Sequence, residues 1–68
     1  MIQVESSTIK AVEYMSALYL LTIEFHNGGV YHYKSVEHKV YQGLMESESK
    51  GKYFHKHIRG KYDYKKEK

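Results

Sequence analysis

Apolar and polar residues alternate along two short runs that flank the segment His26-Asn27-Gly28-Gly29. The first run ends at Phe25 and the second begins at Val30, and alternation of this kind is typical of a strand with one buried face. Asn-Gly between two such runs indicates a hairpin turn, because both residues tolerate the left-handed backbone that the turn requires. The pattern therefore predicts two antiparallel strands joined at this segment.

The register of this hairpin decides which side chains share a face. A two-residue loop pairs Phe25 with Val30. A three-residue loop, with a bulge at the second glycine, pairs Phe25 with Tyr31. The same register pairs Ile23 with Tyr33. A slip of one residue exchanges the two faces of a strand, and the three-residue loop gathers the apolar set on one face, so we predict that register.

A further strand is predicted upstream, from Ile9 to Tyr14, which completes a meander of three antiparallel strands. The connection that follows it, Met15-Ser16-Ala17-Leu18, contains none of the usual turn residues Gly, Pro, Asn and Asp. Two interpretations stay open. Either the turn is a loose one, or its apolar residues cover another surface.

Downstream of the hairpin the apolar spacing changes to the helical period, with one face formed by Val40, Tyr41, Leu44 and Met45. Ser35 is the predicted N-cap of this helix, and Glu37 lies near the positive end of its dipole. Gly51 is predicted to end the helix or to lie just beyond it.

A second, short helix is predicted over about Lys52 to Arg59. Phe54 and Ile58 are one turn apart and point toward the core. The opposite side carries Lys52, His55, Lys56 and Arg59. The fold class is therefore α+β, a three-stranded antiparallel β-meander followed by one α-helix and a second short basic helix. Residues 4–62 form a single domain, and residues 63–68 form a frayed basic C-terminal tail.

Length and composition exclude several classes of protein. A chain of 68 residues and 8.1 kDa has room for one small domain that buries only about 60% of its unfolded surface. Cysteine is absent, which excludes a disulfide framework, a zinc ribbon and a thiol nucleophile. The longest apolar run, Ala17 to Leu21, is far shorter than the roughly 18 residues of a membrane span. No secretion signal is visible, so we expect a cytoplasmic protein.

Charge is distributed unevenly along the chain. Residues 1–49 carry a net charge of −3, and residues 50–68 carry +6. A dense basic segment with interleaved aromatic residues favours a polyanionic partner, either RNA or an acidic protein surface. The alternative is a solvated helix face that continues into a lysine-rich tail without a binding role. The predicted RNA- or phosphate-binding residues are Lys50, Lys52, Lys56, Arg59 and Lys61.

The order of residues also resembles a known family. The segments that carry the resemblance are Ser6-Ser7-x-Ile9, Val12-x-Tyr14, Leu21-x-Ile23-x-Phe25, Gly28-Gly29-Val30-Tyr31-His32-Tyr33, Val36, Val40-Tyr41, Leu44, Ser49-Lys50-Gly51-Lys52-Tyr53-Phe54, Ile58 and Tyr62. Together they resemble the KTSC domain, whose hallmark is a central Tyr-x-Tyr. That family occurs alone in bacteria and phages and at the C-terminus of some lysyl-tRNA synthetases. The resemblance runs from about Val4 to Tyr62.

The resemblance implies three strands followed by helices, no catalytic residues, and a suggested role in binding RNA. The chain departs from the family at four positions. The family usually has Gly in place of Glu13, Asp in place of Met15, Pro in place of Glu37 and Asn in place of His55. The first two departures fall at the apolar turn, so we expect this turn to serve a role particular to this chain.

The sequence gives little support for a metal site, a base-stacking platform or a catalytic site. His55 and His57 are two residues apart, so they lie on different sides of a helix and would not share a metal ion. Tyr31 and Tyr33 suggest a base-stacking platform, yet the predicted register turns both rings toward the core, and they are left out of the predicted site. No spacing places a general base beside a nucleophile. We therefore predict no enzymatic activity, no metal and no cofactor.

The sequence thus predicts a small, basic, non-catalytic module that binds or accompanies RNA. The alternative is a protein–protein interaction module of a phage or mobile element that acts on a host protein. Met15, Leu18 and Tyr19 are a predicted protein contact, through a weak homodimer or a hydrophobic partner. The other interpretation places Leu18 and Tyr19 in a longer second strand, with only Met15 exposed.

Overall fold

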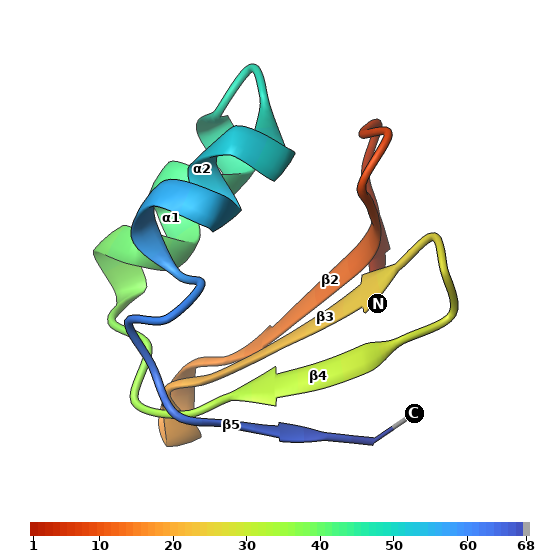
Figure 1. Ribbon diagram of the computed structural model, residues 1–68. Helices are drawn as coiled ribbons and strands as arrows, with labels where there is room; N and C mark the ends of the chain where they lie inside the picture. Colours follow the sequence, from red (N-terminus) through yellow and green to blue (C-terminus); the bar gives the residue numbers. More distant parts are fainter. Residues whose placement is uncertain (68) are drawn as a thin grey trace.

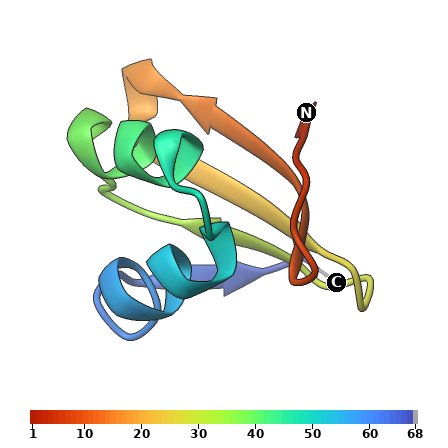
Figure 2. The same cartoon turned by 90° about the horizontal axis from the view of Figure 1, so that it is seen from above.

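The computed structural model describes residues 1–67, which form one antiparallel sheet with two helices on one of its faces (Figure 1). The strands lie in the order β1-β2-β3-β4-β5. The elements are β1 (Ile2–Gln3), β2 (Ile9–Met15), the 3-10 turn η1 (Ser16–Leu18), β3 (Leu20–Phe25), β4 (Val30–Tyr33), α1 (His38–Glu46), α2 (Lys50–His57) and β5 (Tyr64–Lys66). Seen from above, both helices lie on the same side of the sheet (Figure 2). The α+β class is confirmed.

The prediction of three strands understates the sheet, which has five. The central meander β2-β3-β4 matches the predicted one, and β1 and β5 extend it at its two edges. Both added strands are short, at two and three residues. Edge strands of two and three residues are too short to carry a periodic pattern, which is why alternation of apolar residues did not reveal them.

The strand β5 corrects the prediction that residues 63–68 form a frayed tail. The backbone amide of Lys34 donates a hydrogen bond of 2.8 Å to the carbonyl of Asp63. The amide of Glu67 donates one of 2.7 Å to the carbonyl of Val30. These bonds hold both ends of β5 against β4, so most of the basic tail belongs to the sheet; its last residue lies outside the described part of the chain.

The hairpin between β3 and β4 keeps the predicted face but not the predicted register. Ile23 lies opposite Tyr31, and Leu21 lies opposite Tyr33. The left-handed position in the turn is Gly28, with φ of 94°, where only glycine avoids strain. The pairing differs from the predicted one by two residues. Because side chains alternate with a period of two, this shift leaves the apolar residues on the helix-facing side, as predicted.

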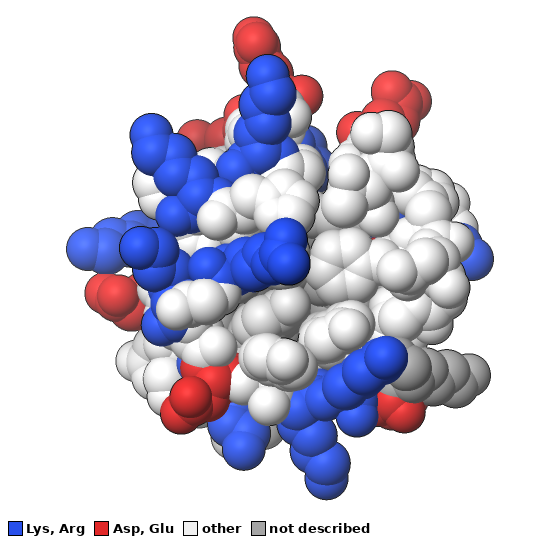
Figure 3. Space-filling view, in the orientation of Figure 1, with Lys and Arg blue, Asp and Glu red and all other residues white. Residues whose placement is uncertain are grey.

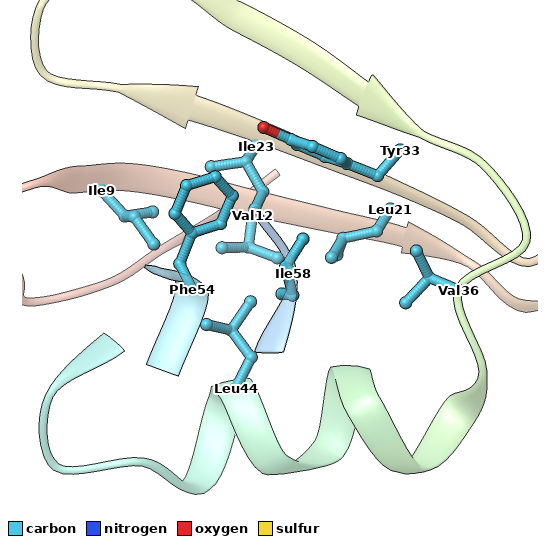
Figure 4. Close-up of a cluster of buried hydrophobic side chains, with 9 residues drawn as sticks. All are labelled: Ile9, Val12, Leu21, Ile23, Tyr33, Val36, Leu44, Phe54 and Ile58. Atoms are coloured by element: carbon cyan, nitrogen blue, oxygen red, sulfur yellow. The ribbon is translucent and has the colours of Figure 1, made fainter. Parts of the chain in front are cut away.

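The core fills the space between this face of the sheet and the helices (Figure 4). It consists of Ile9, Val12, Leu21, Ile23, Tyr33, Val36, Leu44, Phe54 and Ile58. Leu44 is the core residue of α1. The inward orientation predicted for Phe54 and Ile58 is confirmed, since they are 4% and 0% exposed. These two contacts fix the rotation of the second helix and therefore decide which of its residues face solvent.

The helix boundaries differ from the predicted ones. The N-cap of α1 is Glu37, because Ser35 has φ of 59° and belongs to the preceding turn. Gly51 does not end α1 but lies in the first turn of α2, where a Cβ atom would sit 3.0 Å from the hydroxyl oxygen of Thr8. Glycine there allows the helix to approach the chain just before β2. Within residues 1–67, neither helix has the length and apolar character needed to cross a membrane.

The turn between β2 and β3 exposes a group of large apolar side chains. Met15, Leu18 and Tyr19 are 46%, 62% and 54% exposed, and we call them the apolar tip. Tyr19 has φ of 51° and caps the 3-10 turn instead of extending β3. The interpretation that placed Leu18 and Tyr19 in a longer strand is therefore wrong, and the tip is a short, tight turn.

Candidate nucleic-acid interface

The second helix carries the residues predicted to bind RNA. We call the five residues Lys50, Lys52, Lys56, Arg59 and Lys61 the α2 basic surface. Lys52 and Lys56 are exposed and four residues apart on one side of α2, and Arg59, also exposed, follows in the turn after the last helical residue, His57. The helix begins at a serine N-cap, Ser49, whose side chain accepts a hydrogen bond from the amide of Lys52. The predicted outward stripe is thus present in the fold.

The two flanking lysines, Lys50 and Lys61, differ in how far their side chains are exposed to solvent. The side-chain nitrogen of Lys50 donates a 3.1 Å hydrogen bond to the carbonyl of Ser47, and the residue is half-buried. Lys61 is exposed, in the turn that follows α2, where its amide donates to the carbonyl of Ile58. Lys50 is therefore partly committed to holding the helix start, whereas Lys61 presents its full charge to solvent.

No acidic side chain within residues 1–67 forms an ion pair with the α2 basic surface. The lysines that do have acidic partners lie elsewhere: Lys10 is 3.8 Å from Glu24, and Lys39 is 3.8 Å from Glu37. Figure 3 shows basic side chains over the helices and a second group along the β5 side, with uncharged surface between them. The cations of the α2 basic surface are therefore not neutralised by ion pairs within the described residues.

The uncharged surface contains a cleft of about 320 Å³ between the end of α2, the β3–β4 turn and β5. We call it the aromatic cleft, because five of its lining residues are Phe25, Tyr31, Tyr33, Phe54 and Tyr64. The others are Thr8, Asn27, His55, Arg59 and Gly60. Arg59 belongs to both this cleft and the α2 basic surface, so the two features are continuous.

The rings of the aromatic cleft pack against one another in edge-on and tilted arrangements. The ring of Phe54 lies 5.2 Å from that of Phe25 and 5.6 Å from that of Tyr33. The ring of Tyr64 lies 5.3 Å from that of Tyr31 and 5.6 Å from that of Tyr33. Such separations are typical of stabilising aromatic pairs. The rings therefore form a preorganised wall and not a flexible apolar patch.

Two cationic side chains and an imidazole border this wall. The amino group of Lys66 lies 5.7 Å from the centroid of the Tyr31 ring, within the range of a cation–π contact. A guanidinium nitrogen of Arg59 lies 3.2 Å from Nδ1 of His55. Because arginine can only donate, Nδ1 accepts, and the proton of a neutral His55 ring is on Nε2.

The pKa of the Tyr33 hydroxyl is shifted by its burial and by its neighbours in the cleft. Burial raises the pKa of Tyr33 to about 12, and the neighbouring Tyr31 and Tyr64 hydroxyls add to the rise. Arg59 acts in the opposite direction and lowers the pKa, which places its positive charge within electrostatic reach of the phenol. The Tyr33 hydroxyl therefore stays protonated at physiological pH and remains a hydrogen-bond donor.

A second hollow, of about 400 Å³, lies at the start of α2 and includes the segment Ser49-Lys50-Gly51-Lys52. Two of the predicted phosphate-binding residues, Lys50 and Lys52, belong to this segment. The carboxylate residues Glu5 and Glu48 also line the hollow, however, and they oppose the binding of an anion. The hollow adds lysine charge to the surrounding surface, but its mixed lining does not favour a dedicated phosphate site.

The histidines do not gather in one place. His32 lies on the open face of the sheet, 2.7 Å from the hydroxyl of Thr22 and 2.6 Å from a carboxylate oxygen of Glu67. His57 lies against the ring of Tyr53 at 4.4 Å. Among the described residues, no group of three or more His, Cys, Asp or Glu side chains could hold a metal ion.

Sequence reasoning missed the aromatic cleft although it singled out two of its residues. Tyr33 is buried, as predicted, but Tyr31 is only partly buried, and both line the cleft. The missing wall is Tyr64, which was assigned to the frayed tail. The sequence Tyr64-Lys65-Lys66 fits a charged edge strand with one ring facing inward, but it is too short to identify such a strand.

Comparisons with known proteins agree with this fold. A family model described as the KTSC domain matches residues 5–62. Lysine–tRNA ligases from Trichormus variabilis and Nostoc sp. are 47% and 43% identical over 60 residues, which are 88% of this chain but only 11% of each ligase. The crystal structure of a KTSC domain protein from Yersinia pestis is 34% identical with a TM-score of 0.92, covering 94% of this chain and 90% of that one.

Proposed function

The chain belongs to the KTSC domain family, and we propose that it is a non-catalytic module that binds single-stranded RNA by its phosphate backbone. The observation that supports this proposal is the α2 basic surface, whose cations have no acidic partner within residues 1–67. Four of its five cations are lysines, which act as point charges toward phosphate and do not make the bidentate contacts of arginine with a base. Binding would therefore depend strongly on salt and weakly on sequence.

The relatives make RNA the favoured polyanion. A segment similar to this chain makes up 11% of the length of each of three lysine–tRNA ligases. In those proteins a domain of this kind is therefore attached to a protein named for tRNA. A basic domain carried by such a protein would meet RNA at high effective concentration. An acidic protein would satisfy the same charges, and RNA is preferred because of this attachment.

A purely binding role fits the composition of the site. The lining of the aromatic cleft, as described within residues 1–67, contains no carboxylate, and Nδ1 of its one histidine, His55, is occupied by Arg59. General acid–base cleavage of RNA needs a base within hydrogen-bond reach of a nucleophile and a second group that orients it. The cleft supplies stacking surface and positive charge instead, which are the requirements of binding.

The test is the salt dependence of binding to a labelled single-stranded RNA. If about four phosphates are neutralised, the logarithm of the affinity should fall with the logarithm of salt concentration with a slope of about −3. The variant Lys52→Gln/Lys56→Gln/Arg59→Gln should reduce the slope to about −1. It should also weaken binding at 0.1 M salt by about 100-fold, because each lost contact accounts for about fivefold there. Circular dichroism would verify that the variant folds.

A matched control removes the same charge elsewhere. The variant Lys10→Gln/Lys34→Gln/Lys39→Gln also lowers the net charge by three, but its lysines lie outside the α2 basic surface. We expect the control to retain most of the affinity and of the slope. Equal weakening by the two variants would mean that net charge alone drives binding, and unchanged affinity of the folded α2 variant would remove the site from this helix.

We propose a second function for the apolar tip, a weak contact with a second copy of the chain. Three large side chains that are roughly half exposed at one turn favour this role, because burial of apolar surface gains about 25 cal/mol per Å². Covering about 300 Å² on each of two subunits would gain about 15 kcal/mol before association costs. Those costs are about 4–15 kcal/mol, so the expected homodimer is weak.

A further inference from the structure

The aromatic cleft and the α2 basic surface meet at Arg59, which lines the cleft and follows the outward stripe of the helix. Lys66 of β5 places its amino group 5.7 Å from the ring of Tyr31, which also lines the cleft. The cleft is thus bordered by one cation that follows α2 and one from β5. An RNA strand that crosses it would place backbone phosphates beside both cations, with a base between them.

The walls of the cleft differ in how much ring surface they offer. Tyr33 and Phe54 are each 4% exposed and form a fixed floor. Tyr64 is 57% exposed, and its ring packs in a tilted arrangement against the rings of Tyr31 and Tyr33. The neighbouring rings already fix the position of the Tyr64 ring, so a base can stack on it with little loss of side-chain conformational freedom.

The polar groups at the mouth of the cleft are predominantly donors. The neutral His55 ring carries its proton on Nε2, and Arg59 has guanidinium N–H groups beyond the one directed at His55. The side-chain oxygen of Asn27 accepts from the amide of Gly29, which leaves the Asn27 amide nitrogen for a ligand. A nucleobase presents ring nitrogens and carbonyl oxygens to such donors, whereas an aliphatic side chain would leave them unpaired.

From this arrangement we propose that the aromatic cleft holds one unpaired base of the RNA strand, stacked on Tyr64, while the adjoining phosphates contact Arg59 and Lys66. The proposal rests on the function proposed above and adds a base-binding element to it. Stacking requires only a planar ring and is tolerant of sequence, so the cleft would select single-stranded over duplex RNA and not one base over the others.

The experiment compares two ligands that share a backbone. One is a single-stranded ribo-oligonucleotide, and the other is an oligomer of the same length that carries abasic residues. Wild-type protein should bind the oligonucleotide on the order of tenfold more tightly than the abasic oligomer, the size of effect expected for one stacked base. Tyrosine fluorescence, the dominant emission in a chain without tryptophan, should be quenched by the oligonucleotide only.

Two variants locate the effect. Tyr64→Leu keeps an apolar side chain on β5 but removes the ring, and it should lower the affinity for the oligonucleotide to that for the abasic oligomer. Its affinity for the abasic oligomer should not change. The control is Tyr41→Leu, because Tyr41 is a half-buried tyrosine on α1 that belongs neither to the cleft nor to the apolar tip. This control should bind both ligands as the wild type does.

The possible failures are distinguishable. Equal affinity of the wild type for both ligands would overturn the base-binding proposal and leave backbone binding in place, and this comparison does not depend on whether a variant folds. Absence of binding to either ligand would overturn the proposed function and this inference with it. An acidic tyrosine-containing peptide of equal charge should bind no better than the abasic oligomer. Tighter binding of that peptide would assign the cleft to a protein side chain.

Discussion

Replacement of Tyr64 by alanine tests whether β5 belongs to the folded sheet. The residue is 57% exposed, so about two-fifths of its surface is covered by Tyr31, Tyr33 and their surroundings. For a side chain of about 200–250 Å² this amounts to about 90 Å², or about 2 kcal/mol at 25 cal/mol per Å². Alanine retains its methyl group and the unfolded chain already buries some surface, so we expect a loss of about 1–2 kcal/mol.

Thermal and urea unfolding followed by circular dichroism measure this loss. In a domain of this size, 1–2 kcal/mol corresponds to a decrease in Tm of about 5–15 °C. The control is Lys65→Ala, one residue further along β5 on the opposite face, which should change stability by less than about 0.5 kcal/mol. If both variants unfold at the wild-type temperature, Tyr64 does not pack on the sheet and the tail is frayed in solution, as its lysine content alone suggests.

Three further outcomes follow from particular residues. Because burial raises the pKa of Tyr33 to about 12 from the ordinary 10, the fold favours the neutral phenol. The free energy of unfolding should therefore hold below pH 10 and fall between pH 10 and 12, and Tyr33→Phe should reduce that fall in denaturant titrations at each pH. Gly28→Ala should cost about 1 kcal/mol or more in a urea titration, since φ is 94° there and no atom within 4 Å could compensate. Sedimentation should show a mass that rises with concentration for the wild type and a monomer for Met15→Asp/Leu18→Ser; a wild-type monomer throughout would exclude the homodimer.

The parts of the fold that were predictable are those with a complete local pattern. Alternation of apolar residues indicated the central hairpin and its faces, and the helical wheel indicated that Phe54 and Ile58 point inward. The register was wrong by two residues. Burial decides only which face each side chain points to, and a shift of two residues leaves every side chain on the same face, so burial could not distinguish the two pairings. The N-cap was misplaced because Ser35 adopts a positive φ, a choice that serine does not signal by its identity.

The candidate site was only half predictable for a topological reason. The α2 basic surface lies on one continuous segment, residues 50–61, so the sequence spacing of its cations was enough to reveal it. The aromatic cleft is built from the β3–β4 hairpin, α2 and β5, which are far apart in sequence. Its recognition depended on β5, and a three-residue strand with two lysines carries too short a pattern to identify. The sequence therefore assigned Tyr31 and Tyr33 to the core, and it did not show that Tyr64 on β5 completes a cleft beside them.

The placement of β5 gives the basic C-terminal segment two roles that cannot be separated by truncation. Removal of residues 63–67 would delete the cation of Lys66, an edge strand and the exposed wall of the aromatic cleft together, although the net charge of these five residues is zero. Loss of RNA binding by such a truncated chain would fit electrostatic attraction, stacking or unfolding equally well. Neighbouring residues of the strand separate these causes, because Tyr64 faces the cleft and Lys65 faces the open side of the sheet. A ring removed at Tyr64 therefore tests stacking, and a charge removed at Lys66 tests the proposed phosphate contact. Lys65, on the open side of the sheet, is the control, and none of these substitutions changes the length of the chain.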